Sequence, residues 1–195
     1  MRDESPWMVF AAIDRMQRHL RPGARVFEWG SGGSTLFFAK RAGEVVAVEH
    51  DEKWAAQVRE ACAGHDYRHV TVDFIPPDST PPAETFDPAD PGRAYSSAKA
   101  YHGLTFQHYT ERILAFPDAH FDIVVVDGRA RPACLRLALP KVKPGGLLVL
   151  DNSDRPHYRP ARALAVAAGW KEQELFGPGP YLSFFWQTTV WQRPV

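Results

Sequence analysis

The strongest structural signal in this sequence is a glycine cluster between a short apolar run and a segment that can form a helix. The run is Arg25–Trp29, the cluster is Gly30-Ser31-Gly32-Gly33, and residues 34–41 can be capped by Ser34 and continue as a helix. Glycines between a strand and a helix allow the backbone to approach a ligand closely. A strand–turn–helix unit of this kind is typical of α/β folds, in which parallel strands alternate with helices.

The alternation continues to the end of the chain. Apolar runs predict further strands at residues 44–49, 69–75, 121–126, 147–150, 172–176 and 184–192. Helices are predicted at residues 5–20, 51–62, 105–116, 133–139 and 160–168, with Trp54, Val58 and Cys62 on one face of the second. No helix separates the last two strands, so the final strand should run antiparallel to its neighbours. The pattern predicts an α/β fold: a Rossmann-like, doubly wound, seven-stranded, mostly parallel sheet with an antiparallel last strand and helices on both faces.

The chain length of 195 residues, with 45% hydrophobic and 24% charged residues, is typical of one globular domain. We expect residues 1–195 to form a single domain with an N-terminal helix and an inserted proline-rich loop at about 76–104. Six prolines between residues 76 and 92 cannot continue a helix or an inner strand, so this segment should be an exposed loop. Loops of this length are often lids or binding loops.

The charges of the chain balance, because Lys plus Arg and Asp plus Glu both number 23. No net charge therefore favours nucleic acid, an anionic membrane or an acidic partner. The two cysteines, Cys62 and Cys134, lack the spacing of a disulfide framework or a zinc site. Residues 7–13 follow acidic residues, unlike a signal peptide, and no run approaches the ~18 apolar residues of a transmembrane helix. These features predict a cytoplasmic protein.

The residues around the glycine turn favour a nucleoside ligand. A dinucleotide-binding turn has the pattern G-x-G-x-x-G, but Thr35 stands at the third glycine position, and an ionised Glu28 before the turn disfavours a pyrophosphate. Glu49 ends the next strand, 21 residues after Glu28, where a carboxylate can accept both hydroxyls of a ribose. The alternative is a structural tight turn with a helix-capping carboxylate.

Three motifs occur in order: Glu28-Trp29-Gly30-Ser31-Gly32, Glu49, and Lys143-Pro144-Gly145-Gly146 before the fifth strand. As a set they resemble the class I S-adenosylmethionine-dependent methyltransferases over nearly the whole chain. The resemblance implies that the turn lines the methionine moiety, Glu28 helps to hold its amino end, Glu49 binds the ribose and His50 lies near the adenine. Asp73 and Phe74 match positions that contact the adenine, although Asp73 could equally be a strand-end acid. The implied donor-binding residues are Glu28, Gly30, Ser31, Gly32, Ser34, Glu49, His50, Asp73, Phe74 and Asp127.

Three oxygen-bearing side chains follow the fourth and fifth strands: Asp127, Asp151 and Asn152. Neighbouring strands lie about 4.8 Å apart, so these groups come within coordinating reach and suit Mg²⁺ or Ca²⁺. The pattern is similar to that of the cation-dependent small-molecule O-methyltransferases, which implies a divalent metal. The departure is at Gly128-Arg129-Ala130-Arg131, where Arg129 adds a positive charge that could replace the metal. Alternatively, the two acids are strand-terminal caps or substrate ligands, with Arg129 paired to one of them.

A hydroxyl acceptor must lose its proton during methyl transfer, either to a metal that lowers its pKa or to a base. The candidate catalytic residues are Asp127, at the switch-point crevice, and two loop histidines, His157 and His102; each histidine is alternatively a solvated side chain. Aromatic residues could shape an acceptor pocket, and Phe106 could instead belong to the core. They are Tyr95, Tyr101, Phe106 and Tyr158, whereas Trp186 and Trp191 should pack in a last strand that covers the sheet edge.

The sequence thus predicts an S-adenosylmethionine-dependent methyltransferase with a small-molecule acceptor, most readily a hydroxyl oxygen. Asp127-Gly128-Arg129 differs from the Asn/Asp-Pro-Pro-Tyr/Phe motif of amino-group methylases, and no basic excess indicates nucleic acid. The alternatives are a polyamine-synthase-like alkyl transferase on the same fold and a catalytically silent nucleoside-binding subunit. The N-terminal helix and the aromatic last strand are candidate homodimer surfaces, or they complete the monomer core.

Overall fold

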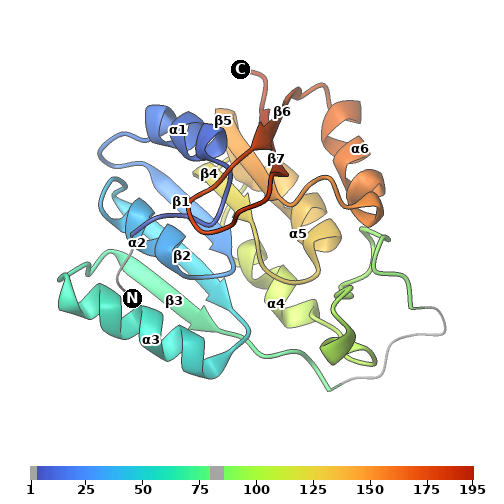
Figure 1. Ribbon diagram of the computed structural model, residues 1–195, viewed down its shortest axis with the longest axis horizontal. Helices are drawn as coiled ribbons and strands as arrows, with labels where there is room; N and C mark the ends of the chain where they lie inside the picture. Colours follow the sequence, from blue (N-terminus) through green and yellow to red (C-terminus); the bar gives the residue numbers. More distant parts are fainter. Residues whose placement is uncertain (1–3, 80–85) are drawn as a thin grey trace.

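The computed structural model describes residues 4–79 and 86–195 and contains one seven-stranded sheet (Figure 1). The strands are β1 (Arg25–Trp29), β2 (Glu44–Glu49), β3 (Val70–Phe74), β4 (Phe121–Val126), β5 (Val142–Asp151), β6 (Lys171–Gly177) and β7 (Trp186–Gln192). The helices are α1 (Phe10–His19), α2 (Gly33–Ala39), α3 (Glu52–Gly64), α4 (Gln107–Glu111), α5 (Arg131–Ala138) and α6 (Arg159–Ala167). Four 3-10 turns are η1 (Lys99–Tyr101), η2 (Arg112–Ala115), η3 (Leu139–Lys141) and η4 (Pro156–Tyr158).

The strand order is β3-β2-β1-β4-β5-β7-β6, which confirms the predicted doubly wound arrangement. Strands β1 to β5 pair in parallel, and β7 runs antiparallel to both β5 and β6. The chain order reverses between β1 and β4, so the switch point lies between these two strands. Ligands of this architecture bind at the carboxyl ends of the strands beside such a point.

Alternate residues of the central strands pack on opposite faces of the sheet, as the side-chain period of a strand requires. Val26 and Ile123 belong to a cluster that includes residues of α1 and α2, and α3 extends this layer beside α2. Phe27 and Val124 face the opposite cluster, which is built with residues of α4, α5 and α6. The two helical layers are visible on either side of the sheet in Figure 1. Burial on both faces explains the continuous apolar runs in the sequence.

Four elements differ from the sequence prediction. Strand β5 begins at Val142 instead of residue 147, so the Lys143-Pro144-Gly145-Gly146 motif lies within the strand and not before it. Helix α1 begins at Phe10 instead of Ser5, because Met8 and Val9 are buried against the sheet before the helix starts. The helix predicted at 105–116 is split into α4 and the 3-10 turn η2. The last strand, β7, does not form the edge of the sheet, which is β6; Trp186 and Trp191 are nevertheless buried as expected.

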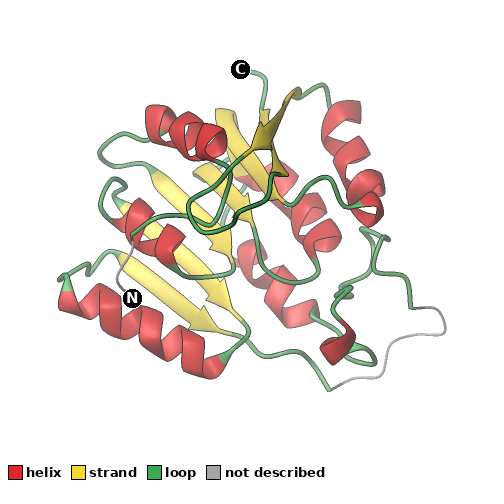
Figure 2. Ribbon diagram, in the orientation of Figure 1, coloured by secondary structure: helices red, strands yellow, loops and turns green. Residues whose placement is uncertain are grey.

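The predicted proline-rich loop leaves the end of β3 and passes along the side of the sheet toward which β2 and β3 point (Figure 2). Its residues 80–85 lie outside the described part of the chain. The remaining loop is not uniformly exposed, since Ala94, Tyr95 and Ser96 are buried, and Asp78 pairs with Thr105 in an isolated bridge. Within residues 4–79 and 86–195, no helix is long and apolar enough to cross a membrane.

Candidate active site

The turn after β1 brings the ends of β1 and β4 into close contact through two glycines. Gly30 has a φ of +90°, and a Cβ atom there would lie 3.1 Å from the backbone nitrogen of Gly128. A Cβ atom on Gly128 would lie 2.9 Å from the nitrogen of Gly30 and would overlap the Tyr109 hydroxyl. Side chains at these two positions would force the strands apart, so glycine is required for the close approach.

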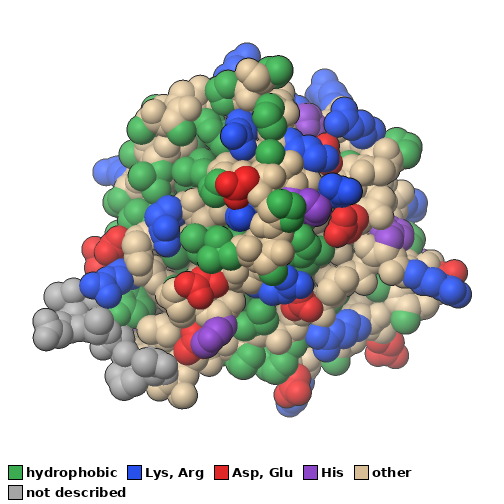
Figure 3. All heavy atoms as spheres, turned by 180° about the vertical axis from the view of Figure 1, so that it is seen from behind, with side chains coloured by type: hydrophobic (Ala, Val, Ile, Leu, Met, Phe, Trp, Pro, Cys, Tyr) green, Lys and Arg blue, Asp and Glu red, His purple; other side chains and the backbone are tan. Residues whose placement is uncertain are grey.

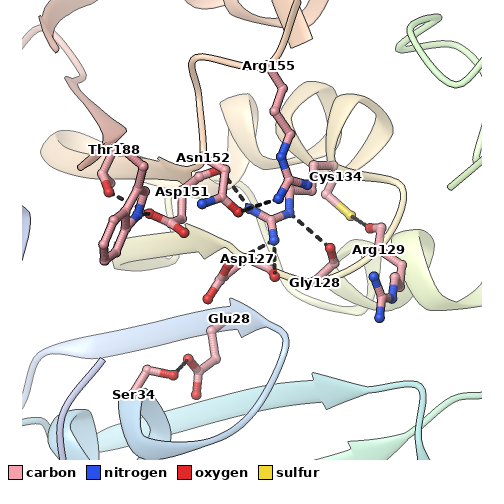
Figure 4. A network of polar contacts seen from close by, with 12 residues as sticks. Glu28, Ser34, Asp127, Gly128, Arg129, Cys134, Asp151, Asn152, Arg155 and Thr188 are labelled. Carbon is pink, nitrogen blue, oxygen red and sulfur yellow. Dashed lines mark hydrogen bonds and ion pairs between the residues drawn. The ribbon is translucent and has the colours of Figure 1, made fainter. Parts of the chain in front are cut away.

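Glu28, near the end of β1, binds the first residues of α2 that follow the glycine turn. Its side chain is fully buried and accepts a hydrogen bond from Ser34 Oγ at 2.7 Å (Figure 4). It also accepts one from Thr35 Oγ1 at 2.5 Å. Burial raises the pKa of Glu28 to about 8, although both hydroxyl hydrogen bonds favour the ionised form. The carboxyl group is therefore mostly neutral at pH 7, which removes the charge that the sequence interpretation assumed next to the ligand.

Glu49, at the end of β2, organises the other side of the turn. Its Oε2 accepts hydrogen bonds from the backbone nitrogen of Ser31 at 3.0 Å and from Ser31 Oγ at 3.2 Å. Its Oε1 accepts from the backbone nitrogens of His50 and Asp51 at 2.8 and 3.0 Å. Burial alone would raise the pKa of Glu49, but the hydrogen bonds outweigh it, and the pKa is lowered. Glu49 is thus a buried, ionised carboxylate at the predicted ribose position.

A cavity of about 520 Å³ opens above these residues, at the carboxyl ends of β1, β2 and β4. Seven of the residues implied by the family resemblance line it: Gly30, Ser31, Gly32, Ser34, Glu49, His50 and Asp127. The other lining residues were not predicted to bind the donor. They are Trp7, Gly33, Asp51, Trp54, Tyr101, Gly128, Arg129 and Arg131. The volume is in the range of small-molecule and cofactor sites, which span about 300–1,000 Å³. We refer to it as the donor cavity.

Three predicted donor residues do not line the donor cavity. Glu28 binds the first residues of α2, as described above. Asp73 accepts a hydrogen bond from Arg112 Nε at 2.7 Å, and Phe74 packs on the cluster around α3. An adenine contact by Asp73 or Phe74 stays a prediction.

One hydrogen bond and one close polar contact join the cavity wall to Glu49. Arg129 Nε donates to His50 Nε2 at 3.1 Å, and His50 Nδ1 lies 2.7 Å from Glu49 Oε1. The Tyr101 hydroxyl lies 3.0 Å from the same Nε2 and narrows this end of the cavity.

Arg131 reaches back from the start of α5 across the ends of β4 and β5. Its guanidinium is buried and donates to the backbone carbonyls of Asp127, Gly128 and Asp151 at 2.7, 3.0 and 2.6 Å. Arg131 Nη2 also lies 2.9 Å from Asp127 Oδ1. Burial raises the pKa of Asp127, and the positive charge of Arg131 opposes that rise.

The three predicted metal ligands are already occupied by protein donors. Asp151 turns toward β7, where Oδ1 accepts from Trp186 Nε1 at 3.0 Å and Thr188 Oγ1 at 2.6 Å (Figure 4). Asn152 Oδ1 accepts from Arg155 Nη2 at 2.9 Å. No group of three or more His, Cys, Asp or Glu side chains in the described ranges could hold a metal ion. With a guanidinium among them, Asp127, Asp151 and Asn152 do not fit a divalent cation.

A second cavity, of about 240 Å³, adjoins the donor cavity and shares the wall formed by Gly128, Arg129 and Arg131. We refer to it as the acceptor cavity. His157 lines it, and its Nε2 is buried without a hydrogen-bond partner. The other predicted base, His102, is exposed against Phe86 and lines neither cavity. Of the predicted aromatic residues, Tyr95 and Tyr158 line the acceptor cavity, Tyr101 lines the donor cavity, and Phe106 is buried in the core.

Comparison with known structures identifies the fold. The chain is similar to a putative O-methyltransferase from Klebsiella pneumoniae, with a TM-score of 0.62 and 20% identity over 95% of this chain and 78% of that one. It is similar to an O-methyltransferase from Bacillus cereus in complex with SAH, with a TM-score of 0.61 and 18% identity over 93% and 77% of the two chains. An rRNA methylase from Streptococcus thermophilus gives a TM-score of 0.56 and 11% identity over 93% of each chain. These similarities concern the fold.

The sheet order, the glycine turn and the crevice at the switch point define a class I S-adenosylmethionine-dependent methyltransferase. A family model for a methyltransferase domain matches residues 27–153, from β1 to the end of β5. The chain belongs to this methyltransferase domain family, and S-adenosylmethionine is its methyl donor. No curated protein matches the sequence.

Proposed function

We propose that this enzyme transfers the methyl group of S-adenosylmethionine to a hydroxyl oxygen of a small molecule. The observation that carries the proposal is the acceptor cavity, which adjoins the donor cavity and is lined by the potential base His157. A volume of about 240 Å³ suits a compact organic molecule. On the face seen in Figure 3, acidic and basic side chains are interspersed, which does not favour a nucleic acid.

The protein contributes position and a base to the reaction. The donor, when bound, supplies an electrophilic methyl group on a sulfonium. The acceptor oxygen forms a bond to the methyl carbon as the sulfur–carbon bond breaks, and the demethylated donor leaves as a neutral thioether. The hydroxyl proton passes to the imidazole of His157, which lines the acceptor cavity. Burial and the nearby charges of Arg155 and Arg131 lower the pKa of His157, so its imidazole is neutral at pH 7 and able to accept that proton.

The proposal includes no metal step, because the predicted ligands of Mg²⁺ are bound to Arg131, Arg155 and residues of β7. Arg131, with its fixed positive charge, lies where the sequence predicted the cation. Addition of EDTA should therefore leave the rate unchanged.

The test is formation of the demethylated donor, followed by mass spectrometry, with three matched sets of acceptors. These are small phenols and alcohols, the corresponding anilines and amines, and ribosomal RNA. We expect methyl ethers from the first set only. His157→Gln should lower kcat by about a hundredfold or more, as loss of a general base does, whereas His102→Gln should be close to wild type.

Transfer only to amines or to RNA would contradict the hydroxyl proposal. Donor binding without turnover on any set would favour a catalytically silent nucleoside-binding protein. An equal loss of rate in the His157 and His102 variants would remove His157 as the base, while methyl ether formation would still support the hydroxyl acceptor.

A further inference from the structure

The wall of the acceptor cavity carries more positive charge than the balanced composition of the chain would lead one to expect. Three arginines line it: Arg129 and Arg131 from the segment after β4, and Arg155 from the segment after β5 (Figure 4). Arg131 is neutralised by Asp127. The other two guanidinium groups determine the electrostatic character of the cavity.

Neither Arg129 nor Arg155 has an ion-pair partner in the described parts of the chain. Arg129 donates to His50 and lies over the Tyr101 ring, with 5.3 Å from its guanidinium carbon to the ring centroid. Arg155 donates to the amide oxygen of Asn152 and to the Tyr158 hydroxyl, at 2.9 and 3.3 Å. None of these partners is a carboxylate, so two positive charges remain without an ion pair.

Neutral polar groups complete the lining. Ser96 and Ser97 lie on the wall contributed by the loop after β3, and His157 on the wall that follows β5. Ser96 Oγ accepts only a long hydrogen bond, from the Ala98 nitrogen at 3.3 Å, and retains its own proton to donate. The lining therefore offers hydrogen-bond donors and positive charge, and no carboxylate is among its described residues.

We propose that the acceptor is an anion: a small hydroxylated molecule that also carries a carboxylate or a phosphate, bound by Arg129 and Arg155 in the acceptor cavity. This inference rests on the proposed function and specifies its substrate class. An anionic oxygen group is the partner that planar guanidinium groups bind best. Arg129 also reaches the donor cavity, so one side chain contacts both substrates and links anion recognition to the donor site.

The test is isothermal titration of the protein saturated with S-adenosylhomocysteine. The titrants are benzoate, phenyl phosphate and benzamide, which is the uncharged counterpart of benzoate. Each is titrated into the wild type, Arg155→Gln and Arg159→Gln. Arg159 lies four residues further along, is exposed and lines neither cavity, so it controls for loss of one positive charge.

We expect at least one anion to bind about tenfold or more tightly than benzamide, and Arg155→Gln to remove most of that preference. Arg159→Gln should behave as the wild type. Tighter binding of benzoate would identify a carboxylate acceptor, and tighter binding of phenyl phosphate a phosphate ester. Arg129→Gln should show the same loss and, because Arg129 also supports His50, weaker binding of S-adenosylhomocysteine.

Equal affinity for benzoate, phenyl phosphate and benzamide would overturn the inference, and so would an Arg155→Gln variant that keeps the wild-type preference. In both cases intact binding of S-adenosylhomocysteine would leave the proposed function standing. If the protein does not bind S-adenosylhomocysteine at all, the proposed function itself fails. Binding of S-adenosylhomocysteine by Arg155→Gln also shows that the variant is folded.

Discussion

Asp122 at the amino end of the sheet and the acids Glu28 and Asp127 at its carboxyl end are held in opposite ways. At the amino end, the Asp122 carboxylate lies between Lys143 Nζ at 2.7 Å, Arg21 Nη2 at 3.1 Å and the backbone nitrogen of Arg25 at 2.9 Å. Burial alone would raise the pKa of Asp122, but these partners outweigh it, and the pKa is lowered. At the carboxyl end, burial raises the pKa of both Glu28 and Asp127.

The difference separates a site that stabilises the fold from a site arranged for ligands. The amino end satisfies its charge completely and lines neither of the two cavities. The carboxyl end keeps a neutral acid, two unpaired guanidinium groups and an unpartnered imidazole nitrogen next to two cavities. Clusters of shifted pKa values in a cavity are typical of functional sites.

The largest effect on stability should follow removal of the cation that links β4 and β5. Arg131→Met leaves Asp127 and three backbone carbonyls without their buried donor, which should lower the free energy of unfolding by about 3–5 kcal/mol. Lys143→Met, the matched change at the amino end, should cost only about 1 kcal/mol, since Asp122 keeps two other partners. Urea unfolding of both variants measures the difference. Equal losses would show that the two ends are held alike.

The next effect concerns the donor cavity. Glu49→Ala removes the acceptor of Ser31 and the predicted ribose ligand, so affinity for S-adenosylhomocysteine should fall about a hundredfold. Glu52→Ala, at the exposed start of α3, is the control and should leave the affinity unchanged. The more conservative variant Glu49→Gln, together with melting curves of both variants, checks that the loss of affinity is not caused by unfolding. Wild-type affinity in both Glu49 variants would contradict the ribose assignment.

At the amino end, a smaller change in stability should occur without any change in donor binding. Asp122→Asn should lower the free energy of unfolding by about 1–2 kcal/mol at pH 7, because hydrogen bonds to a charged group are lost. The folded pKa of Asp122 is lowered, so its stabilising contribution is present above the unfolded value of about 3.9 and is lost as the pH falls through the folded pKa.

The variant and the wild type should therefore converge in stability on acidification below about pH 4. Unfolding curves at a series of pH values measure this convergence. A difference that grew on acidification would mean that the Asp122 pKa is raised in the folded protein, and a change in S-adenosylhomocysteine affinity would mean that the two ends of the sheet are coupled.

The sequence predicted the centre of the sheet better than its margins. Strands β1, β2 and β4 begin and end where the apolar runs do, because these strands are buried on both faces and every residue contributes to the pattern. The start of α1 was misplaced because Ser5 and Pro6 have the composition of a helix start, while burial of Met8 and Val9 requires another backbone path. Tertiary packing overrode the local signal there.

For the site, the sequence predicted the residues that a local motif specifies and missed those that are brought in by folding. The glycine turn and Glu49 follow from strand, turn and spacing. Arg131 carries no such signature: only the left-handed turn at Ala130, with a φ of +47°, and the start of α5 direct its guanidinium back to β4 and β5. Trp54 was predicted on one face of α3 with Val58 and Cys62; those two are buried, whereas Trp54 is 41% exposed and lines the donor cavity.

Substitution of Trp54 should have the smallest of these effects, and it should change donor affinity alone. Its Nε1 donates to the Ser31 carbonyl at 2.7 Å, and its ring lies 3.7 Å from the position of a Cβ atom on Gly32. Trp54→Phe keeps most of the ring contact and loses one neutral hydrogen bond, so affinity for S-adenosylhomocysteine should fall about fivefold with unchanged unfolding free energy. Titration calorimetry and urea unfolding measure the two quantities. If Trp54 acted as a core residue like Val58 and Cys62, the order would reverse: stability would fall and donor affinity would not, because a ring buried in α3 packing has no contact with the turn that holds the donor.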